Sequence, residues 1–229
     1  MKYADYIKRI EIDSLWEGRK HIVWELDRHV NILSGVNGDG KSTILNRLVH
    51  GVKSVDEEAC RGVNIDTMPE DAKLIRFDVV FMPEVRSDFD NNLNTVVKRF
   101  NANQDTEERK TKLYSIIERL FSTTEKSVDH AAETLTLLQW GHTLPLYLLS
   151  NGEKQMLTIL LTVFLEEEKP YVLFMDEPEI SLHMEWQKQL IEIITQLNPN
   201  VQVIMTTHSP AIIMNGWMDK VTEVGEITI

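Results

Sequence analysis

The sequence has little of what marks secreted, membrane-spanning or disulfide-stabilised proteins. It holds one cysteine, Cys60, among 229 residues, so no intrachain disulfide can form, and a reducing compartment is the simplest expectation. No apolar run approaches the roughly 18 residues that a membrane span needs. The first residues also lack the basic and apolar regions of a signal peptide. We therefore expect a cytoplasmic protein that works without a membrane segment.

Positive charge is also scarce. Lysine and arginine together number 24, against 36 aspartates and glutamates, which gives a net charge of −12. Such a surface repels the phosphate backbone of nucleic acids, so a free-standing nucleic-acid binder is disfavoured. The basic groups Lys98-Arg99 and Arg109-Lys110-Lys112 are interpreted as a solvated face. Direct DNA binding through them is kept as the alternative.

Apolar periodicity predicts that strands and helices alternate along the chain. We expect strands at 7–12, 21–26, 29–33, 74–82, 171–175 and 201–205, and helices at 44–52, 91–122, 153–168 and 180–197. Residues 135–149 favour a hairpin around Trp140-Gly141, whereas 53–72 show no clear period. This order predicts an α/β fold with parallel central strands. We expect one domain, 1–229, in which 84–148 form a mostly helical insertion subdomain.

A glycine-rich stretch follows the third predicted strand. Residues 35–42 fit the pattern G-x-x-x-x-G-K-[ST] in full. Glycines let successive backbone N–H groups approach phosphate oxygens, and the helix that begins here points its positive dipole end at the anion. Lys41 is expected to reach the β- and γ-phosphates, and Ser42 to offer a hydroxyl to Mg²⁺. The predicted nucleotide contacts are Gly35, Asn37, Gly38, Asp39, Gly40, Lys41, Ser42 and Thr43.

An acidic pair, Asp176 and Glu177, follows the predicted buried strand 171–175. Ligands of open α/β sheets bind at this carboxyl edge. We expect Asp176 to hold Mg²⁺ through water and Glu177 to polarise an attacking water. An acidic loop or helix cap is the ordinary alternative, and the phosphate loop in the same chain favours the catalytic interpretation.

Two further segments carry polar groups that suit a phosphate. His208, in the segment 206–210 after the last predicted strand, is expected to contact the γ-phosphate and take part in catalysis. The second segment, 149–155, lies at the start of another predicted helix. There a hydroxyl, free backbone N–H groups and the positive end of the helix dipole attract anions. Its predicted nucleotide contacts are Ser150, Asn151, Gly152 and Glu153. Taken alone, this second segment is better explained as an ordinary helix cap.

Taken in order, the four elements resemble those of an ATP-binding-cassette (ABC) ATPase. The correspondence is Walker A at 35–43, the signature at 149–155, Walker B at 171–177 and the switch histidine at His208. The resemblance implies a P-loop NTPase fold of ABC type, with antiparallel N-terminal strands beside the central parallel sheet and a helical insertion. It also implies ATP and Mg²⁺ as cofactors and ATP hydrolysis as the activity.

The residues after the Walker B pair narrow the resemblance. The pattern E-P-E-x-x-L-H at 177–183, followed by T-T-H-S-P at 206–210, is similar to the soluble overcoming-lysogenisation-defect and RecF/SMC-like cassettes. Those proteins act in DNA repair and antiphage defence. The sequence shows no long heptad segment, so coiled-coil arms are not expected.

For two functional residues that are typical of the family, the sequence does not indicate which residue of this chain takes the role. Many cassettes carry a glutamine after the strand that follows Walker A, but 81–86 contain none, and Glu84 and Arg86 are alternatives. An aromatic ring that stacks on adenine is also expected. Trp16 and Trp24 both precede the phosphate loop, and core packing is the alternative role of each.

The resemblance implies a dimer, or a higher homo-oligomer, with ATP sandwiched between subunits. Lys41 and Glu177 of one chain would work with Ser150 and Gly152 of the partner subunit. We expect the protein to be the ATPase sensor or motor of a defence or repair complex, with a nuclease-like or other effector on a separate chain. The alternatives are the nucleotide-binding subunit of an ABC transporter and a nucleotide-gated scaffold without significant turnover.

Overall fold

The computed structural model describes residues 2–16, 19–53, 62–80, 88–103 and 105–229. The chain forms two compact units, which are described separately. The first unit comprises 1–84, 169–180 and 200–229, and the second comprises 85–168 and 181–199. The second unit therefore contains most of the predicted insertion together with two segments that lie outside it. The single-domain organisation stays a prediction.

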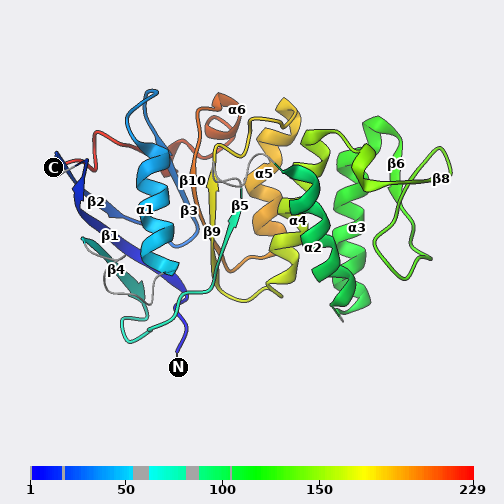
Figure 1. Cartoon of the computed structure of the whole chain (residues 1–229), viewed down its shortest axis with the longest axis horizontal. Coiled ribbons are helices and arrows are strands. Elements are labelled where there is room, and N and C mark those ends of the chain that lie inside the picture. The colour runs from blue at the N-terminus through cyan, green and yellow to red at the C-terminus, as the bar shows by residue number, and fades with distance from the viewer. Residues whose placement is uncertain (1, 17–18, 54–61, 81–87, 104) are drawn as a thin grey trace. The chain divides into compact units, whose positions relative to one another are not determined.

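A five-stranded sheet forms the centre of the first unit, in the order β11-β3-β10-β9-β5. Strands β3, β10, β9 and β5 of this sheet are labelled in Figure 1. Every neighbouring pair is parallel. The strands are β3 (Val30–Ser34), β5 (Phe77–Val80), β9 (Tyr171–Asp176), β10 (Val201–Thr206) and β11 (Val221–Glu223). All six residues of β9 and of β10 are buried, as continuous apolar runs in a parallel sheet should be. The predicted parallel sheet is confirmed.

A second sheet of the first unit is antiparallel, in the order β2-β1-β4. Its strands are β1 (Tyr6–Leu15), β2 (Lys20–Glu25) and β4 (Val63–Met68). Helix α1 (Lys41–Lys53) contacts strands of both sheets and lies between them (Figure 1). One apolar cluster joins these layers, with Ile10, Leu48 and Phe174 among its members. Burial of this cluster fixes the helix that follows the phosphate loop.

Strand β4 lies in the region 53–72, for which the sequence indicated no periodicity. Val63 and Ile65 pack against the core cluster, whereas Asn64 and Asp66 are exposed. This alternation spans only a few residues, and β4 is secured by pairing with β1, far away in the sequence. Tertiary pairing therefore decides a strand that local sequence does not predict.

The second unit is built around α4 (Asn151–Leu165), which is buried from Gly152 to Phe164. It packs against α2 (Phe89–Ala102), α3 (Glu107–Phe121) and α5 (Met184–Leu197). A small antiparallel sheet, ordered β6-β7-β8, contains Lys126–Val128, Leu137–Gln139 and His142–Leu144. The unit also holds the short turns η1 (Ser122–Thr124) and η2 (Leu146–Leu148).

Several predicted boundaries in the second unit are wrong. The helix predicted at 91–122 is two helices, because Thr106 caps a new helix after a break at Asn103. The helix predicted from 180 begins at Met184, where the ring of His183 accepts a hydrogen bond from the N–H of Glu185. The predicted hairpin around Trp140 is confirmed with shorter strands, and it pairs with a third strand, β6.

Between β10 and β11, the first unit contains α6 (Pro210–Ile213) and the turn η3 (Met218–Lys220). Among the described residues, no helix is both long and apolar enough to cross a membrane.

Candidate nucleotide-binding site

The phosphate loop connects β3 to α1 in the first unit. Gly38 and Gly40 have φ angles of 91° and 94°, a conformation in which a side chain would be strained. Lys41 is 5% exposed, and its ammonium group donates to the carbonyl oxygens of Gly35 at 2.9 Å and of Val36 at 3.1 Å. The cation therefore lies within the loop, where phosphate oxygens would compete with these two carbonyls.

Asp39 holds the first half of this loop together. Its carboxylate accepts a hydrogen bond from the N–H of Val36 at 2.9 Å. A Cβ atom on Gly35 would lie 2.8 Å from the Asp39 carboxylate, so only glycine fits there without a shift. Asn37 and Gly38 are exposed at the tip, and Thr43 is half-buried in the first turn of α1. The predicted loop contacts thus occupy one continuous turn.

Trp16 lies directly against this loop. A Cβ atom on Gly40 would overlap its indole ring, which is 40% exposed and has the ammonium of Lys20 at 5.2 Å from a ring centroid. Trp24, in contrast, is 2% exposed, and its indole N–H donates to the hydroxyl of Thr222 at 3.3 Å. Of the two tryptophans left open by the sequence, the structure places Trp16 beside the phosphate loop and Trp24 in the core.

Asp176 and Ser42 meet although they are far apart in the sequence. The Ser42 hydroxyl donates to Oδ1 of Asp176 at 3.0 Å, and Asp176 is fully buried at the end of β9. The Thr206 hydroxyl donates to the same oxygen at 2.5 Å. Mg²⁺ prefers oxygen ligands and retains several waters. A hydroxyl beside a carboxylate is therefore a fitting donor set for this ion.

Glu177 and His208 come together at the next position along the sheet edge. Oε1 of Glu177 lies 3.7 Å from Nε2 of His208, and both side chains are partly exposed. Glu177 has a φ of 45°, and its N–H donates to the carbonyl and the hydroxyl of Thr206, each at 3.1 Å. A non-glycine residue in this conformation is strained, and such strain often occurs at functional sites. Sequence reasoning did not identify Thr206, which contacts both carboxylate-bearing residues.

The signature segment belongs to the second unit, where Ser150 caps α4. The Ser150 hydroxyl accepts from the N–H of Glu153 at 3.3 Å, and the Glu153 carboxylate accepts from the N–H of Ser150 at 2.9 Å. Glu153 is 4% exposed and also accepts from Lys126 at 2.7 Å and Thr124 at 3.1 Å. Burial opposes ionisation, but the donors of Lys126 and Ser150 outweigh it and lower the pKa of Glu153.

These contacts give the four signature residues different surroundings. Asn151 is exposed, whereas the Glu153 carboxylate is used within the unit to hold the turn. A Cβ atom on Gly152 would overlap the backbone carbonyl of Ser181, so the close approach requires glycine. We interpret Glu153 and Gly152 as residues that shape the turn, and nucleotide contact by this segment stays a prediction.

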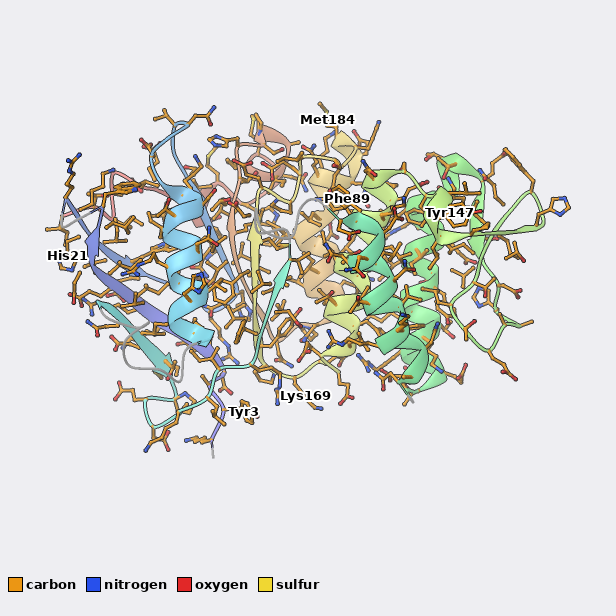
Figure 2. All side chains as sticks on the ribbon, in the orientation of Figure 1. Tyr3, His21, Phe89, Tyr147, Lys169 and Met184 are labelled. Carbon is orange, nitrogen blue, oxygen red and sulfur yellow. The ribbon has the colours of Figure 1, made fainter. Side chains whose placement is uncertain are left out.

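A pocket of about 350 Å³ adjoins the signature turn. It is lined by residues of η1, of the start of α4 and of α5 with the residues before it, among them Thr123, Ser150, Gly152, Ser181, His183 and Trp186. Tyr147 and Met184, labelled in Figure 2, are 67% and 60% exposed. Ser150 and Asn151 are themselves exposed, so the signature turn is accessible on the surface of this unit. The candidate glutamine substitutes Glu84 and Arg86 lie outside the described residues.

Comparison with known proteins identifies the family to which the chain belongs. A family profile described as "AAA domain, putative AbiEii toxin, Type IV TA system" matches residues 65–215, which is more than half of the chain. The chain belongs to this family. The AAA-domain match includes the signature, the Walker B pair and His208, and it begins after the phosphate loop.

Of two curated relatives of this AAA-domain chain, one is described as an ATP-binding protein and the other as a probable ATPase. The phosphate import ATP-binding protein PstB of Spiroplasma kunkelii is 25% identical over 218 residues, which are 89% of this chain and 76% of that protein. The Retron Vc95 probable ATPase of Vibrio cholerae serotype O1 biovar El Tor is 24% identical over 104 residues. That match spans 41% of this chain and 20% of the retron protein.

Solved structures agree on the fold. An SMC head bound to the C-winged helix domain of ScpA has a TM-score of 0.58 at 13% identity, with 92% of each chain covered. The AAA-domain chain is therefore an ABC-type P-loop ATPase by fold and family, and it resembles the SMC-like cassettes, as the four sequence elements predicted.

Proposed function

We propose that this protein binds Mg·ATP and hydrolyses it. The observation that carries the proposal is the group formed by Ser42, Asp176, Glu177 and His208 at one edge of the parallel sheet, next to the phosphate loop. These side chains come from three segments of the first unit, yet hydroxyl, carboxylates and imidazole meet at one place. The arrangement suits phosphoryl transfer to water, in which positioning and charge stabilisation supply most of the rate.

Each residue has a role in this proposal. Lys41 and the loop N–H groups would bind the phosphates, and Ser42 and Asp176 would hold Mg²⁺, which neutralises charge on the phosphate oxygens when bound. Glu177 would polarise the attacking water, and His208 beside it would contact the γ-phosphate. Trp16, because it lies over the loop, would stack on the adenine ring.

The signature residues would act on the nucleotide of a second copy. Ser150 and Gly152 lie at an accessible helix N-terminus, where backbone N–H groups and the helix dipole favour an anion. We infer an ATP-sandwiched homodimer, or a larger homo-oligomer, that ATP stabilises and hydrolysis releases.

For the biological role, we propose an ATPase sensor or motor of an antiphage-defence or DNA-repair complex in the cytoplasm. The match to the retron ATPase and the SMC-like fold support this role. The effector would be a separate protein, since the described SMC head is bound to a ScpA domain. With a net charge of −12, a basic protein surface is a better partner than bare DNA.

The similarity to PstB supports a second candidate, the nucleotide-binding subunit of a transporter. That candidate requires association with a membrane permease, whereas the first requires a non-membrane effector. Tagged protein isolated from its native host, with and without detergent extraction, distinguishes them by the chain that co-purifies stoichiometrically. A scaffold without turnover is the third alternative and is tested by phosphate release.

The direct test compares the wild type with Glu177→Gln and Lys41→Ala. The amide of glutamine cannot polarise water as a carboxylate does, so Glu177→Gln should bind Mg·ATP and lose turnover by about 100-fold or more. Lys41→Ala should lose ATP affinity by at least about tenfold, because hydrogen bonds to charged groups contribute about 1.5–3 kcal/mol each.

Phosphate release gives the rate, titration calorimetry gives the affinity, and size exclusion with Mg·ATP reports assembly, which Glu177→Gln should trap. Lys188→Ala, at an exposed pair with Glu185, serves as the charge-matched control. Wild-type protein that binds ATP without releasing phosphate would favour the scaffold. Equal ATP affinity for Lys41→Ala would remove the phosphate loop as the site.

A further inference from the structure

Glu179, in the turn after β9, is hydrogen-bonded to the segment that follows β10. The Thr207 hydroxyl donates to Oε1 of Glu179 at 2.5 Å, and the backbone N–H of His208 donates to the same oxygen at 2.9 Å. The N–H of Ser209 in turn donates to the Thr207 hydroxyl at 2.9 Å. One carboxylate oxygen therefore receives donors from two successive residues, the second of which is the histidine of the candidate site.

This link is buried. Glu179 is 9% exposed and Thr207 is fully buried, so neither group exchanges its partner for water without cost. Leaving a buried polar group without its hydrogen bond costs about 1–3 kcal/mol, and more for a charged group. The backbone of His208 is thus held at a fixed place relative to Glu179, which lies only two residues after Glu177 in the chain.

A second link joins the same two segments, from Thr206 on one to Asp176 and Glu177 on the other. The Thr206 hydroxyl donates to Asp176 at 2.5 Å and accepts from the N–H of Glu177 at 3.1 Å. Two successive threonines, Thr206 and Thr207, therefore fasten the end of β10 to the turn after β9. These two attachments include the backbone N–H groups of Glu177 and His208, whose side chains lie 3.7 Å apart.

We propose that Glu179 is a positioning residue for hydrolysis, which holds His208 against Glu177 both directly, through the His208 N–H, and through Thr207. The inference rests on the proposed ATPase function. Glu179 does not need to touch the nucleotide, so its loss should lower turnover and leave ATP affinity nearly unchanged. A misplacement of about 1 Å at a catalytic group can cost about 100-fold in rate.

The experiment uses the full chain and compares Glu179→Ala, Thr207→Val and Thr207→Ser. We expect kcat to fall at least about tenfold in the first two, while the ATP dissociation constant changes by less than about threefold. Thr207→Ser restores the hydroxyl and should recover most of the rate. The double variant Glu179→Ala with Thr207→Val should lose less rate than the product of the two single effects, because both changes break the hydrogen bond between Thr207 and Glu179.

The matched control is Thr158→Val. Thr158 is also buried, and its hydroxyl donates to a helix carbonyl in α4 at 2.8 Å. This change should leave kcat within about twofold of the wild type, so a general effect of losing a buried hydroxyl is measured separately. Circular-dichroism melting of every variant checks that the fold is retained.

A second measurement does not depend on turnover. In protein labelled with nitrogen-15 at histidine, the ring signals of His208, assigned with His208→Gln, should shift or broaden in Glu179→Ala and Thr207→Val and return to the wild-type position in Thr207→Ser. If the wild type releases no phosphate, the proposed function fails while these shifts still report on positioning. Unchanged ring signals, or wild-type kcat in folded Glu179→Ala, would overturn the role of Glu179.

Discussion

At the scale of single residues, Trp16 shows what a sequence leaves open. It and Trp24 both precede the phosphate loop, and nothing in their local sequence separates a surface ring from a core ring. The structure separates them, since Trp16 is half-exposed against Gly40 and Trp24 is buried. Trp16 therefore gains a testable role as the base-stacking ring.

We predict that Trp16→Ala weakens ATP binding by about 5- to 100-fold, because stacking of a base on an aromatic ring contributes about 1–3 kcal/mol. Trp16→Phe should keep most of the affinity. Calorimetry with inorganic triphosphate gives the control, since this ligand has no base and should bind both variants as it binds the wild type. Equal weakening for triphosphate and ATP would mean that Trp16 supports the loop instead of the base.

The site residues that could be predicted from the sequence share one property: each lies in a short motif at the end of a predicted strand. Lys41, Asp176 and His208 follow strand ends, so their meeting at one sheet edge was predictable. Thr206 and Glu179 were not predictable in the same way. Their contacts depend on how the ends of two neighbouring strands, and the turns that follow them, approach each other. Threonine and glutamate are also common at such positions, so neither residue type indicates a site by itself.

At the scale of elements, the start of α4 is stabilised by a carboxylate that is largely buried. Glu153 closes the capping box with Ser150 and accepts from Lys126. Helix starts of this kind can be predicted from the pattern of serine followed three residues later by glutamate. The contribution of Lys126 could not be predicted, because it comes from β6, a three-residue strand without a sequence signal.

We predict that Glu153 makes the stability of the protein depend on pH. Its pKa is lower in the folded protein than in the unfolded chain, so its stabilising effect is present near neutral pH and is lost as the pH falls through the folded pKa. Glu153→Gln should therefore destabilise the protein at pH 7 and less so in acid. Urea unfolding at pH 7 and pH 4 measures this, with the exposed Glu192→Gln as the control. A stability difference independent of pH would contradict the assignment.

At the scale of the whole molecule, the residues that the sequence predicts as nucleotide contacts belong to two different units of the chain. The phosphate loop, Asp176, Glu177 and His208 belong to the first unit, and the signature turn belongs to the second. The sequence predicted the fold class and the order of motifs, because each motif is local. It could not predict the membership of the units, since the first unit collects three separate stretches of the chain.

We predict that Ser150→Arg blocks hydrolysis but leaves ATP binding to the isolated subunit intact, because Ser150 would serve the nucleotide of the other copy. Mixing Ser150→Arg with Lys41→Ala subunits should restore up to about a quarter of the wild-type activity per dimer at equal ratio, because about half of the dimers are then mixed and each mixed dimer keeps one of its two composite sites. Phosphate release across mixing ratios is the measurement. Activity that stays at the level of the separate variants, although subunit exchange is shown by labelling, would contradict the shared site.

The order of strands in the parallel sheet also has a consequence for synthesis of the protein. In that sheet, β3, which carries the phosphate loop, lies between β10 and β11. Its partners therefore leave the ribosome long after the loop itself. Until then the loop has no sheet to support it, and β3 presents unpaired backbone groups that invite association with other chains. ATP cannot assist the early steps of folding, and nascent chains that end before Val201 should need chaperones to remain free of aggregates.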